Sequence, residues 1–289
     1  MNRLRGGWKS VTLYLLLLIL SVFSLEAQVR REMGRTTRSV DPLGADEAES
    51  FLQDFRSSRG GMDSIFEGRL IHYPRRGDKM TLPVTLYSGW DGPVLKIRIE
   101  VGDDPLLPTD RLLFQGGPDP KGWSWTLEDG VVPLPPEDLL QPVLPQLDLT
   151  AFDLTAPYLD WPGTYDRSER VSDSPAHWFR FEPPNDAWQQ ILSEGGIVSV
   201  RVALDARFNA PVRVEYLDSW DGVLRSLEVR SFKKVKDTWI VRRLEAFDEV
   251  SRDRTELRID DSSVELTLPR DIYLPDSLSE PVVSIEGQF

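Results

Sequence analysis

The sequence predicts a mostly β protein, namely a curved antiparallel sheet or half-open barrel of about eleven strands with an N-terminal helix and a covering loop. Three observations predict this class. Runs of alternating apolar and polar residues recur along the chain, short turn sequences separate them, and long helical patterns between strands are missing. The 289 residues include 9 Trp and are 40% hydrophobic, which is enough for a substantial core.

The first 27 residues have the layout of a secretory signal peptide. Basic residues lie before an almost wholly apolar run from Val11 to Leu25, and a small residue, Ala27, follows. The run is shorter than the ~20 residues that span a bilayer, so we expect cleavage near Ala27, with a retained inner-membrane anchor as the alternative. Residues 28–44 are expected to form a flexible tail, and residues 45–289 to form the folded domain.

Composition narrows the location and the partners. The chain has no Cys, so neither a disulfide nor a cysteine-linked lipid is available to it. Its formal net charge is −13, and residues 1–27 carry +2, so the mature chain carries −15. Nucleic acid is excluded as a partner, because phosphate binding needs a basic surface. Four arginines in the tail are the local exception, either solvated or contacting anionic lipid. A bacterial periplasm fits best.

One amphipathic helix is expected from Asp46 to about Ser58. Phe51, Leu52 and Phe55 recur at helical spacing among acidic and polar residues. We expect Phe51 and Phe55 to lie on an apolar surface.

Almost everything after this helix is expected to be strand. The clearest alternation is Leu95, Ile97, Ile99 and Val101, interleaved with Lys96, Arg98 and Glu100. It predicts one buried face and one face in water. Similar patterns at 198–202, 212–216 and 255–259, joined by short turns, predict an antiparallel meander.

The tripeptide Trp-Asp-Gly occurs twice, at 90–92 and 220–222. Asp-Gly between alternating runs is a strong hairpin signal, since type I′ turns need positive φ at both central residues. We expect turns at both places, with Trp90 and Trp220 covering the hairpin ends, rather than a repeated binding site.

Residues 131–145 contain five prolines alternating with leucines. Because proline does not fit central strands, this segment is expected to cross the sheet as an ordered apolar covering loop with at most one helical turn. An interdomain linker is the alternative.

No catalytic or metal-binding motif is present. The two histidines, His72 and His177, lie far apart in sequence, and acidic pairs such as Asp260–Asp261 point to opposite faces of a strand. We therefore expect no enzyme activity, no cofactor and no metal.

Aromatic residues are concentrated in the middle of the chain. Trp123 and Trp125 share one strand face, and His177, Phe179 and Phe181 share another. They are either plain core or the lining of a cavity, since a curved sheet of about eleven strands encloses more volume than its side chains fill.

Several stretches resemble the outer-membrane lipoprotein-sorting branch of the LolA-like family. They are "LTAFDLTAPYLDWPGTYDRSERV" (149–171), "HWFRFEPP" (177–184), "KVKDTWIVRRLEAFDEVSRDRTELRID" (234–260) and "DIYLPDSL" (271–278). The resemblance covers roughly residues 45–280, and it consists of strand and turn patterns.

The resemblance implies an eleven-stranded half-barrel that holds acyl chains of lipoproteins or other lipids in the periplasm. Phe51, Phe55, Trp123, Trp125, Phe179 and Phe181 are then the candidate cavity lining. The family's carriers have an Arg-Pro step on an early strand that helps to hold the lid shut. The comparable stretch here, "LYSGWDGPVLKIRIEV" (86–101), lacks it, and the segment 131–145 is the candidate lid instead.

The leading hypothesis is therefore a periplasmic lipid or lipoprotein carrier with transient membrane contact. Two alternatives stay open. One is a non-catalytic module of the cell envelope that docks a transporter or assembly machine, which a solid interior would favour. The other is an enzyme acting on glycans or lipids, which converging carboxylates in a cleft would favour.

Overall fold

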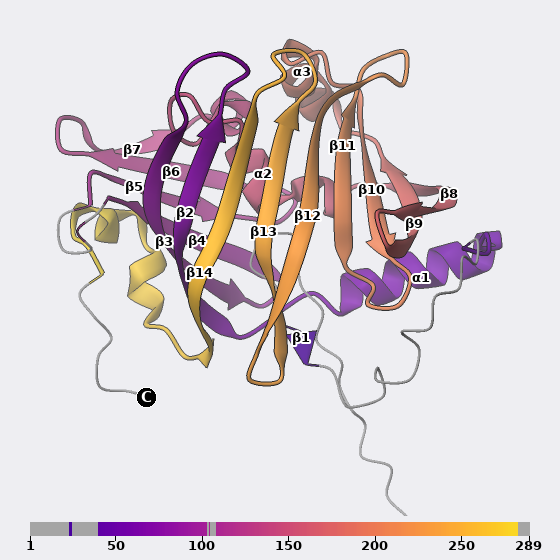
Figure 1. The fold of residues 1–289 in the computed structure, drawn as a ribbon, viewed down its shortest axis with the longest axis horizontal. Helices are drawn as coiled ribbons and strands as arrows, with labels where there is room; N and C mark the ends of the chain where they lie inside the picture. The colour runs from indigo at the N-terminus through magenta and orange to yellow at the C-terminus, as the bar shows by residue number, and fades with distance from the viewer. Residues whose placement is uncertain (1–22, 25–39, 103, 105–107, 283–289) are drawn as a thin grey trace, which may run out of the picture.

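The strands of this chain form one antiparallel sheet with an unclosed, strongly curved shape (Figure 1). The computed structural model describes residues 23–24, 40–102, 104 and 108–282. Within them, thirteen strands follow one another in the order β7-β6-β5-β4-β3-β2-β14-β13-β12-β11-β10-β9-β8, and the short β1 pairs with β13. Apart from Phe23–Ser24, the expected signal peptide lies outside the described residues, as does most of the expected tail.

The strands have the following bounds: β1 Phe23–Ser24, β2 Asp63–Tyr73, β3 Met80–Asp91, β4 Val94–Val101, β5 Asp110–Gln115, β6 Lys121–Thr126, β7 Gly130–Leu134, β8 Gly163–Val171, β9 Ser174–Phe181, β10 Ser199–Asp205, β11 Pro211–Leu217, β12 Val223–Val235, β13 Thr238–Asp248 and β14 Arg254–Leu266. The helices are α1 Ala45–Ser57, α2 Ala151–Thr155 and α3 Asp186–Glu194, with 3-10 turns η2 Pro136–Leu140, η3 Pro157–Asp160, η4 Arg270–Tyr273 and η5 Pro275–Ser279.

The sheet consists of two meanders that meet at one seam. Strands β2 to β7 run outward to one edge and β8 to β14 return from the other, and β2 pairs with β14 through partners such as Leu70 and Leu257. The connection from β7 to β8 must therefore pass from one edge of the sheet to the other. Residues 135–162, which we call the covering segment, make this crossing on the concave side.

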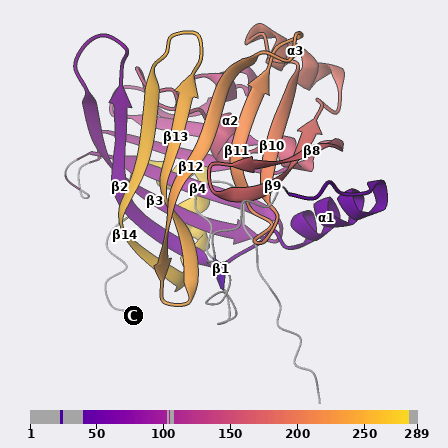
Figure 2. The same cartoon turned by 45° about the vertical axis from the view of Figure 1, so that its right-hand side comes forward.

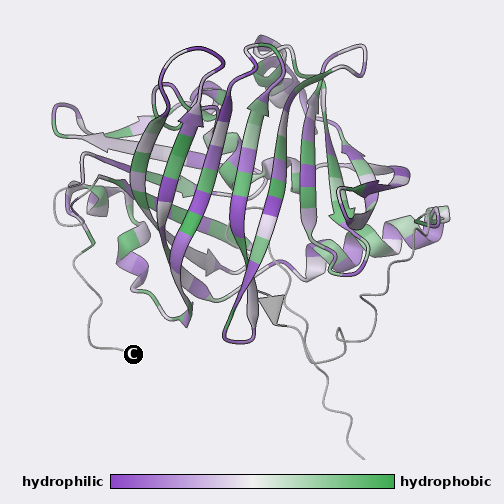
Figure 3. Cartoon of the chain, viewed as in Figure 1, coloured by the Kyte–Doolittle hydropathy of each residue, from purple (hydrophilic) through white to green (hydrophobic). Residues whose placement is uncertain are grey.

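The concave face and the covering segment enclose the main hydrophobic core. Alternating residues of most strands belong to it. Apolar and polar residues along the strands appear as green and purple bands in Figure 3. The covering segment contributes eleven buried apolar side chains: Leu139, Leu144, Leu147, Leu149, Ala151, Phe152, Leu154, Ala156, Tyr158, Leu159 and Trp161. The predicted covering loop is confirmed from residue 135 onward, with η2 as its helical turn, whereas residues 131–134 belong to the edge strand β7.

The helix α1 matches the expected helix closely and covers one end of the concave side (Figure 2). Its side chains of Ala48, Leu52 and Phe55 are buried. Glu47 accepts a hydrogen bond from the backbone N–H of Gly44 across 2.8 Å, which satisfies one free donor at the helix start.

Two sequence expectations about the sheet are corrected. The outer face of β4 is not in water, because Arg98 is 1% exposed and Glu100 is 4% exposed under the C-terminal residues 267–282. Edge strands β7 and β8 bring the count above eleven. They lack apolar alternation, since an edge strand tolerates Pro133 in β7 and carries charges in β8.

Both Trp-Asp-Gly sequences lie at hairpins, but neither turn is the expected type I′. Asp91 pairs with Val94, so the first loop is Gly92–Pro93, in which Gly92 has φ +60°. The second loop spans five residues between the paired Leu217 and Val223, and its Asp221 has φ +60°.

Candidate functional site: the covered concave face

Helix α2 places the covering segment against the sheet. Thr150 and Asp153 cap each other reciprocally: Thr150 N–H donates to Asp153 Oδ2 at 2.7 Å, and Asp153 N–H donates to Thr150 Oγ1 at 3.1 Å. The helix ends at Ala156, whose left-handed φ of 45° turns the chain into Pro157 and η3. The local sequence thus folds into two consecutive short helical elements, α2 and η3, which we call the plug.

An aromatic cluster fills the interior beneath this plug. Phe152 lies at its centre, with ring centroids 5.4 Å from Tyr158, 5.9 Å from Trp161, 5.6 Å from Trp188 and 6.0 Å from Tyr216. All five side chains are at most 8% exposed. The concave space is therefore occupied by the chain's own side groups.

A polar contact fastens the plug to the sheet within this apolar surrounding. Tyr216 on β11 donates to Asp153 Oδ1 at 2.5 Å, and Arg225 on β12 forms an ion pair with the same carboxylate and a hydrogen bond to Asp148 O. Burial raises the pKa of Tyr216 well above its usual range, and the Asp153 charge adds to this. Burial lowers the pKa of Arg225, but Asp153, Tyr216 and Asp148 together outweigh it, and the net shift is upward. We call Asp153, Tyr216 and Arg225 the latch.

A second fastening lies at Asp148. Its backbone N–H donates to Thr255 Oγ1 at 2.8 Å, and the Thr255 hydroxyl donates to Asp148 Oδ2 at 2.9 Å. His72 Nδ1 lies 3.3 Å from the same carboxylate oxygen. Burial raises the pKa of Asp148. This histidine and carboxylate converge, but neither lines either of the pockets described below.

Four of the six predicted lining residues come together on the concave side. Phe51 of α1 stacks on Phe179 of β9 at 6.0 Å and meets His177 edge-on at 5.0 Å. Phe55 and Phe181 are both 0% exposed in the same core. These residues continue the filled interior toward α1.

Trp123 and Trp125 lie on the opposite face of the sheet. Trp123 pairs with Leu113, and both belong to a separate cluster with Tyr273 and Leu278 beneath the C-terminal residues. The guanidinium of Arg111 lies 3.8 Å from the centre of the Trp125 ring. Their expected place in the concave lining is therefore wrong, because alternation separates two faces without saying which is concave.

The latch residues were not predicted. The signal for Asp153 was present, since Thr-x-x-Asp at 150–153 before an apolar helix is a capping pattern. Nothing in the local sequence pairs it with Tyr216 or Arg225, which lie 63 and 72 positions away.

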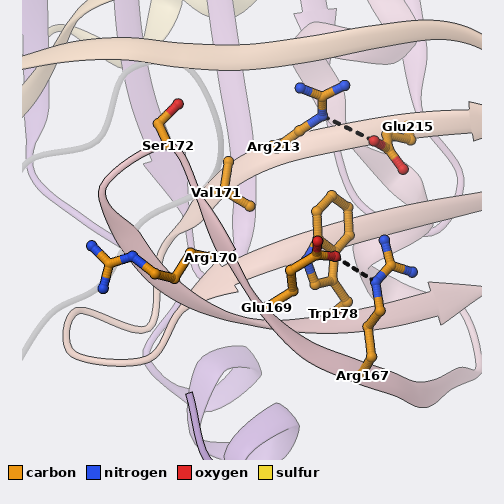
Figure 4. Close-up of a pocket in the computed structure, with 8 residues that line it drawn as sticks. All are labelled: Arg167, Glu169, Arg170, Val171, Ser172, Trp178, Arg213 and Glu215. Atoms are coloured by element: carbon orange, nitrogen blue, oxygen red, sulfur yellow. Dashed lines mark hydrogen bonds and ion pairs between the residues drawn. The ribbon is translucent and has the colours of Figure 1, made fainter. Parts of the chain in front are cut away.

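Two pockets lie outside the concave interior. The first, of about 260 Å³, is on the outer face of β8, β9 and β11, around Trp178 and the ion-paired Arg167, Glu169, Arg213 and Glu215 (Figure 4). The second, of about 480 Å³, lies between Arg98 and the C-terminal residues. Neither is lined by a residue of the main core.

In the described ranges, no three metal-ligating side chains gather into a cluster. No helix among the described residues is both long enough and apolar enough to cross a bilayer.

No family model and no curated protein matches this chain. Solved structures do match. A domain assigned as an outer membrane lipoprotein-sorting protein from Vibrio parahaemolyticus aligns with a TM-score of 0.70 and 16% identity, over 82% of this chain and 100% of that one. A DUF1329 family protein from Desulfovibrio piger aligns with a TM-score of 0.67 and 14% identity, over 81% and 98%.

A LolA superfamily protein from Nitrosomonas europaea aligns with a TM-score of 0.60 and 14% identity, over 80% of this chain and 99% of that one. Together with the strand order and the covered concave face, these matches define the class: the protein has a LolA-like fold.

Proposed function

We propose that the protein is a non-catalytic lipid or lipoprotein carrier of the bacterial cell envelope, exported to the periplasm by residues 1–27. In this proposal an acyl chain binds the concave face in an open state, after the covering segment has left it. The observation that carries the proposal is the apolar concave face of a LolA-like sheet, covered by a segment that belongs to neither meander. The Vibrio protein of this fold is named for lipoprotein sorting.

The filled interior makes opening a requirement. Phe152, Leu154 and Leu159 occupy surface that an acyl chain would need, and each is at most 1% exposed. An acyl chain gains about 0.8 kcal/mol per buried CH₂, so a long chain can replace the apolar contacts of the plug. The latch then sets how easily the covering segment leaves.

The experiment measures uptake of a fluorescent fatty acid by the chain from residue 28 onward, after mass spectrometry of lipids extracted from the purified protein. Tyr216→Phe removes one latch hydrogen bond and keeps the ring, so we expect faster and greater uptake than in the unmodified chain. Trp125→Leu lies on the outer face and is expected to leave uptake unchanged. Absence of both co-purified lipid and uptake, in the unmodified chain and in Tyr216→Phe, would refute the carrier.

A second function is favoured by the same filled interior. A solid core needs no cargo, and the protein then acts as a non-catalytic docking module for an envelope transporter or assembly machine. If the protein is such a docking module, we expect it to bind no lipid. Its latch variants should then lose stability without taking up more fatty acid.

A further inference from the structure

The two Trp-Asp-Gly sequences place their tryptophans in opposite environments. Trp90 is 6% exposed in the main core, whereas Trp220 is 89% exposed at the tip between β11 and β12. Exposed indole surface of this size is costly in water and is typical of a residue that anchors a contact. Hairpin formation alone does not require it.

The turn holds Trp220 outward in a fixed conformation. Asp218 Oδ1 accepts the backbone N–H of Trp220 at 2.7 Å and that of Gly222 at 2.8 Å. Asp218 N–H donates to Gly222 O at 2.9 Å, and Asp221 pairs with Arg180 at 2.7 Å. The tip therefore satisfies the backbone N–H groups of Asp218, Trp220, Asp221 and Gly222 internally while it displays an apolar side chain.

The next hairpin tip, between β13 and β14, is built in the same way. Asp248 Oδ1 accepts the N–H groups of Val250 and Ser251, both at 2.7 Å, and Val250 is 75% exposed. In each tip an aspartate thus supports an exposed apolar residue two positions later.

These tips adjoin one another at one end of the sheet, where the β2–β3 tip also lies (Figures 1 and 2). Glu249 N–H donates to Leu224 O at 2.9 Å, which joins the β13–β14 tip to the start of β12. Arg75 N–H donates to Asp253 Oδ1 at 2.6 Å, which joins the β2–β3 tip to the same loop. We call residues 74–79, 218–222 and 249–253 the tip surface.

We propose that the tip surface is a membrane-contacting site that inserts Trp220 and Val250 into the interface of a phospholipid bilayer containing anionic lipid. Tryptophan prefers the headgroup level of a bilayer, and backbone groups without partners are costly there. The two aspartate-supported turns lower this cost by accepting the backbone N–H groups of Trp220, Gly222, Val250 and Ser251. Positive charge is local to the β2–β3 tip, where Arg75, Arg76 and Lys79 are exposed beside Asp78. The other two tips carry four carboxylates against one arginine, so the preference for anionic lipid rests on the β2–β3 tip alone.

The small apolar area indicates a reversible contact. A stable protein complex buries about 800 Å² on each partner, far more than one indole and one valine provide. Weak, reversible binding is what a protein that visits a membrane needs. The contact extends the proposed carrier function without resting on it, because vesicle binding requires no cargo.

The experiment is flotation of the chain from residue 28 onward with vesicles of phosphatidylethanolamine and phosphatidylglycerol, compared with phosphatidylcholine alone. We expect the unmodified chain to bind the anionic vesicles. Binding should be roughly tenfold weaker in Trp220→Ser and weaker again in Trp220→Ser/Val250→Ser. The variant Arg75→Gln/Arg76→Gln should show less preference for anionic lipid. Leu127→Ser is the matched control, since Leu127 is 87% exposed on the separate β6–β7 tip, and its binding should equal that of the unmodified chain.

Equal binding by Trp220→Ser and the unmodified chain would overturn the proposal, as would an equal loss in Leu127→Ser. Absence of vesicle binding by the unmodified chain would overturn it too and would leave a protein partner as the occupant. Uptake of the fluorescent fatty acid by Trp220→Ser is measured in parallel. Retained uptake with lost vesicle binding separates membrane contact from cargo binding.

Discussion

Tyr216 of β11 donates a hydrogen bond to the carboxylate of Asp153 on α2 at 2.5 Å, and both side chains are 0% exposed. The contact joins the covering segment to the middle of the second meander. It places a charge inside an otherwise aromatic cluster, where an unpaired carboxylate is costly. The covering segment is thereby held in one position by polar geometry as well as by apolar packing.

Asp153→Ala is therefore expected to destabilise the protein strongly. The variant leaves the mostly buried Arg225 without its carboxylate and removes the cap of α2, and breaking a buried ion pair costs about 3–5 kcal/mol. Urea unfolding followed by near-ultraviolet circular dichroism measures the change in the free energy of unfolding.

Asp237→Asn is the control for this variant. Asp237 pairs with Lys234 at 3.3 Å but its side chain is 88% exposed, and such surface pairs contribute at most about 1 kcal/mol. If the two variants lost similar stability, the latch would be no more than an ordinary surface pair.

Arg98 is expected to hold the C-terminal residues on the outer face. It is 1% exposed, and its guanidinium donates to Ile272 O at 3.2 Å, to Ser277 O at 3.1 Å and to Glu100 Oε1 at 2.7 Å. Arg98→Met removes all these donors and leaves Glu100 without its cationic partner, so residues 267–282 should exchange amide hydrogens much faster. Hydrogen exchange measured by mass spectrometry checks this, and Lys96→Met, on the same strand, serves as the control. Unchanged exchange at 267–282 in Arg98→Met would contradict this role.

Stability is expected to fall on mild acidification because of His177. This ring is 6% exposed beneath Phe51, and burial lowers its pKa below the ordinary value, while Asp205 partly opposes the shift. The unfolded chain then takes up the proton first, near pH 6.5, so the stabilising contribution is present above that pH and is lost as the pH falls toward the folded-state pKa.

The melting temperature at pH 7.5 and pH 5.0 measures this effect. The unmodified chain should lose more stability between these values than His177→Gln, in which the glutamine side chain can still accept from Ser168, the present neighbour of Nδ1 at 2.7 Å. If the unmodified chain and His177→Gln lost the same amount of stability between pH 7.5 and pH 5.0, the pH dependence would come from other groups.

Local sequence patterns were sufficient to predict some elements of the fold. The alternation in β4 and the helical spacing of Phe51 and Phe55 are consequences of backbone geometry, so they predicted the strand and α1 correctly. The Pro-Leu pattern at 131–145 predicted a covering loop because proline is excluded from central strands.

Long-range contacts decided the rest. Trp123 and Trp125 alternate as expected, but their face became the outer one because the C-terminal residues pack on it. Arg98 looked solvent-exposed for the same reason, since the Ile272 and Ser277 carbonyls that it contacts are 174 and 179 positions away. The seam between β2 and β14 likewise has no local signature, because antiparallel pairing depends on partners that only the complete sheet brings together.

Gly68→Ala is expected to disrupt that seam. A Cβ at Gly68 would lie 2.2 Å from the backbone oxygen of Arg258, where no flexible side chain can move aside. The close approach arises because β14 has a register shift between Ile259 and Asp261, directly opposite Gly68. Overpacking of this kind typically costs about 1–3 kcal/mol of stability. The strain would affect β2 and β14, the two strands that join the meanders.

Thermal and urea unfolding of Gly68→Ala and of the control Gly195→Ala check this prediction. A Cβ at Gly195 would find its nearest atom, Ile197 Cδ1, at an ordinary 3.5 Å, so the control should change stability by no more than about 0.5 kcal/mol. If the two variants had the same unfolding midpoint, β14 would be able to shift at its bulge and accommodate the added Cβ without loss of stability. The two meanders would then be joined less rigidly than the register indicates.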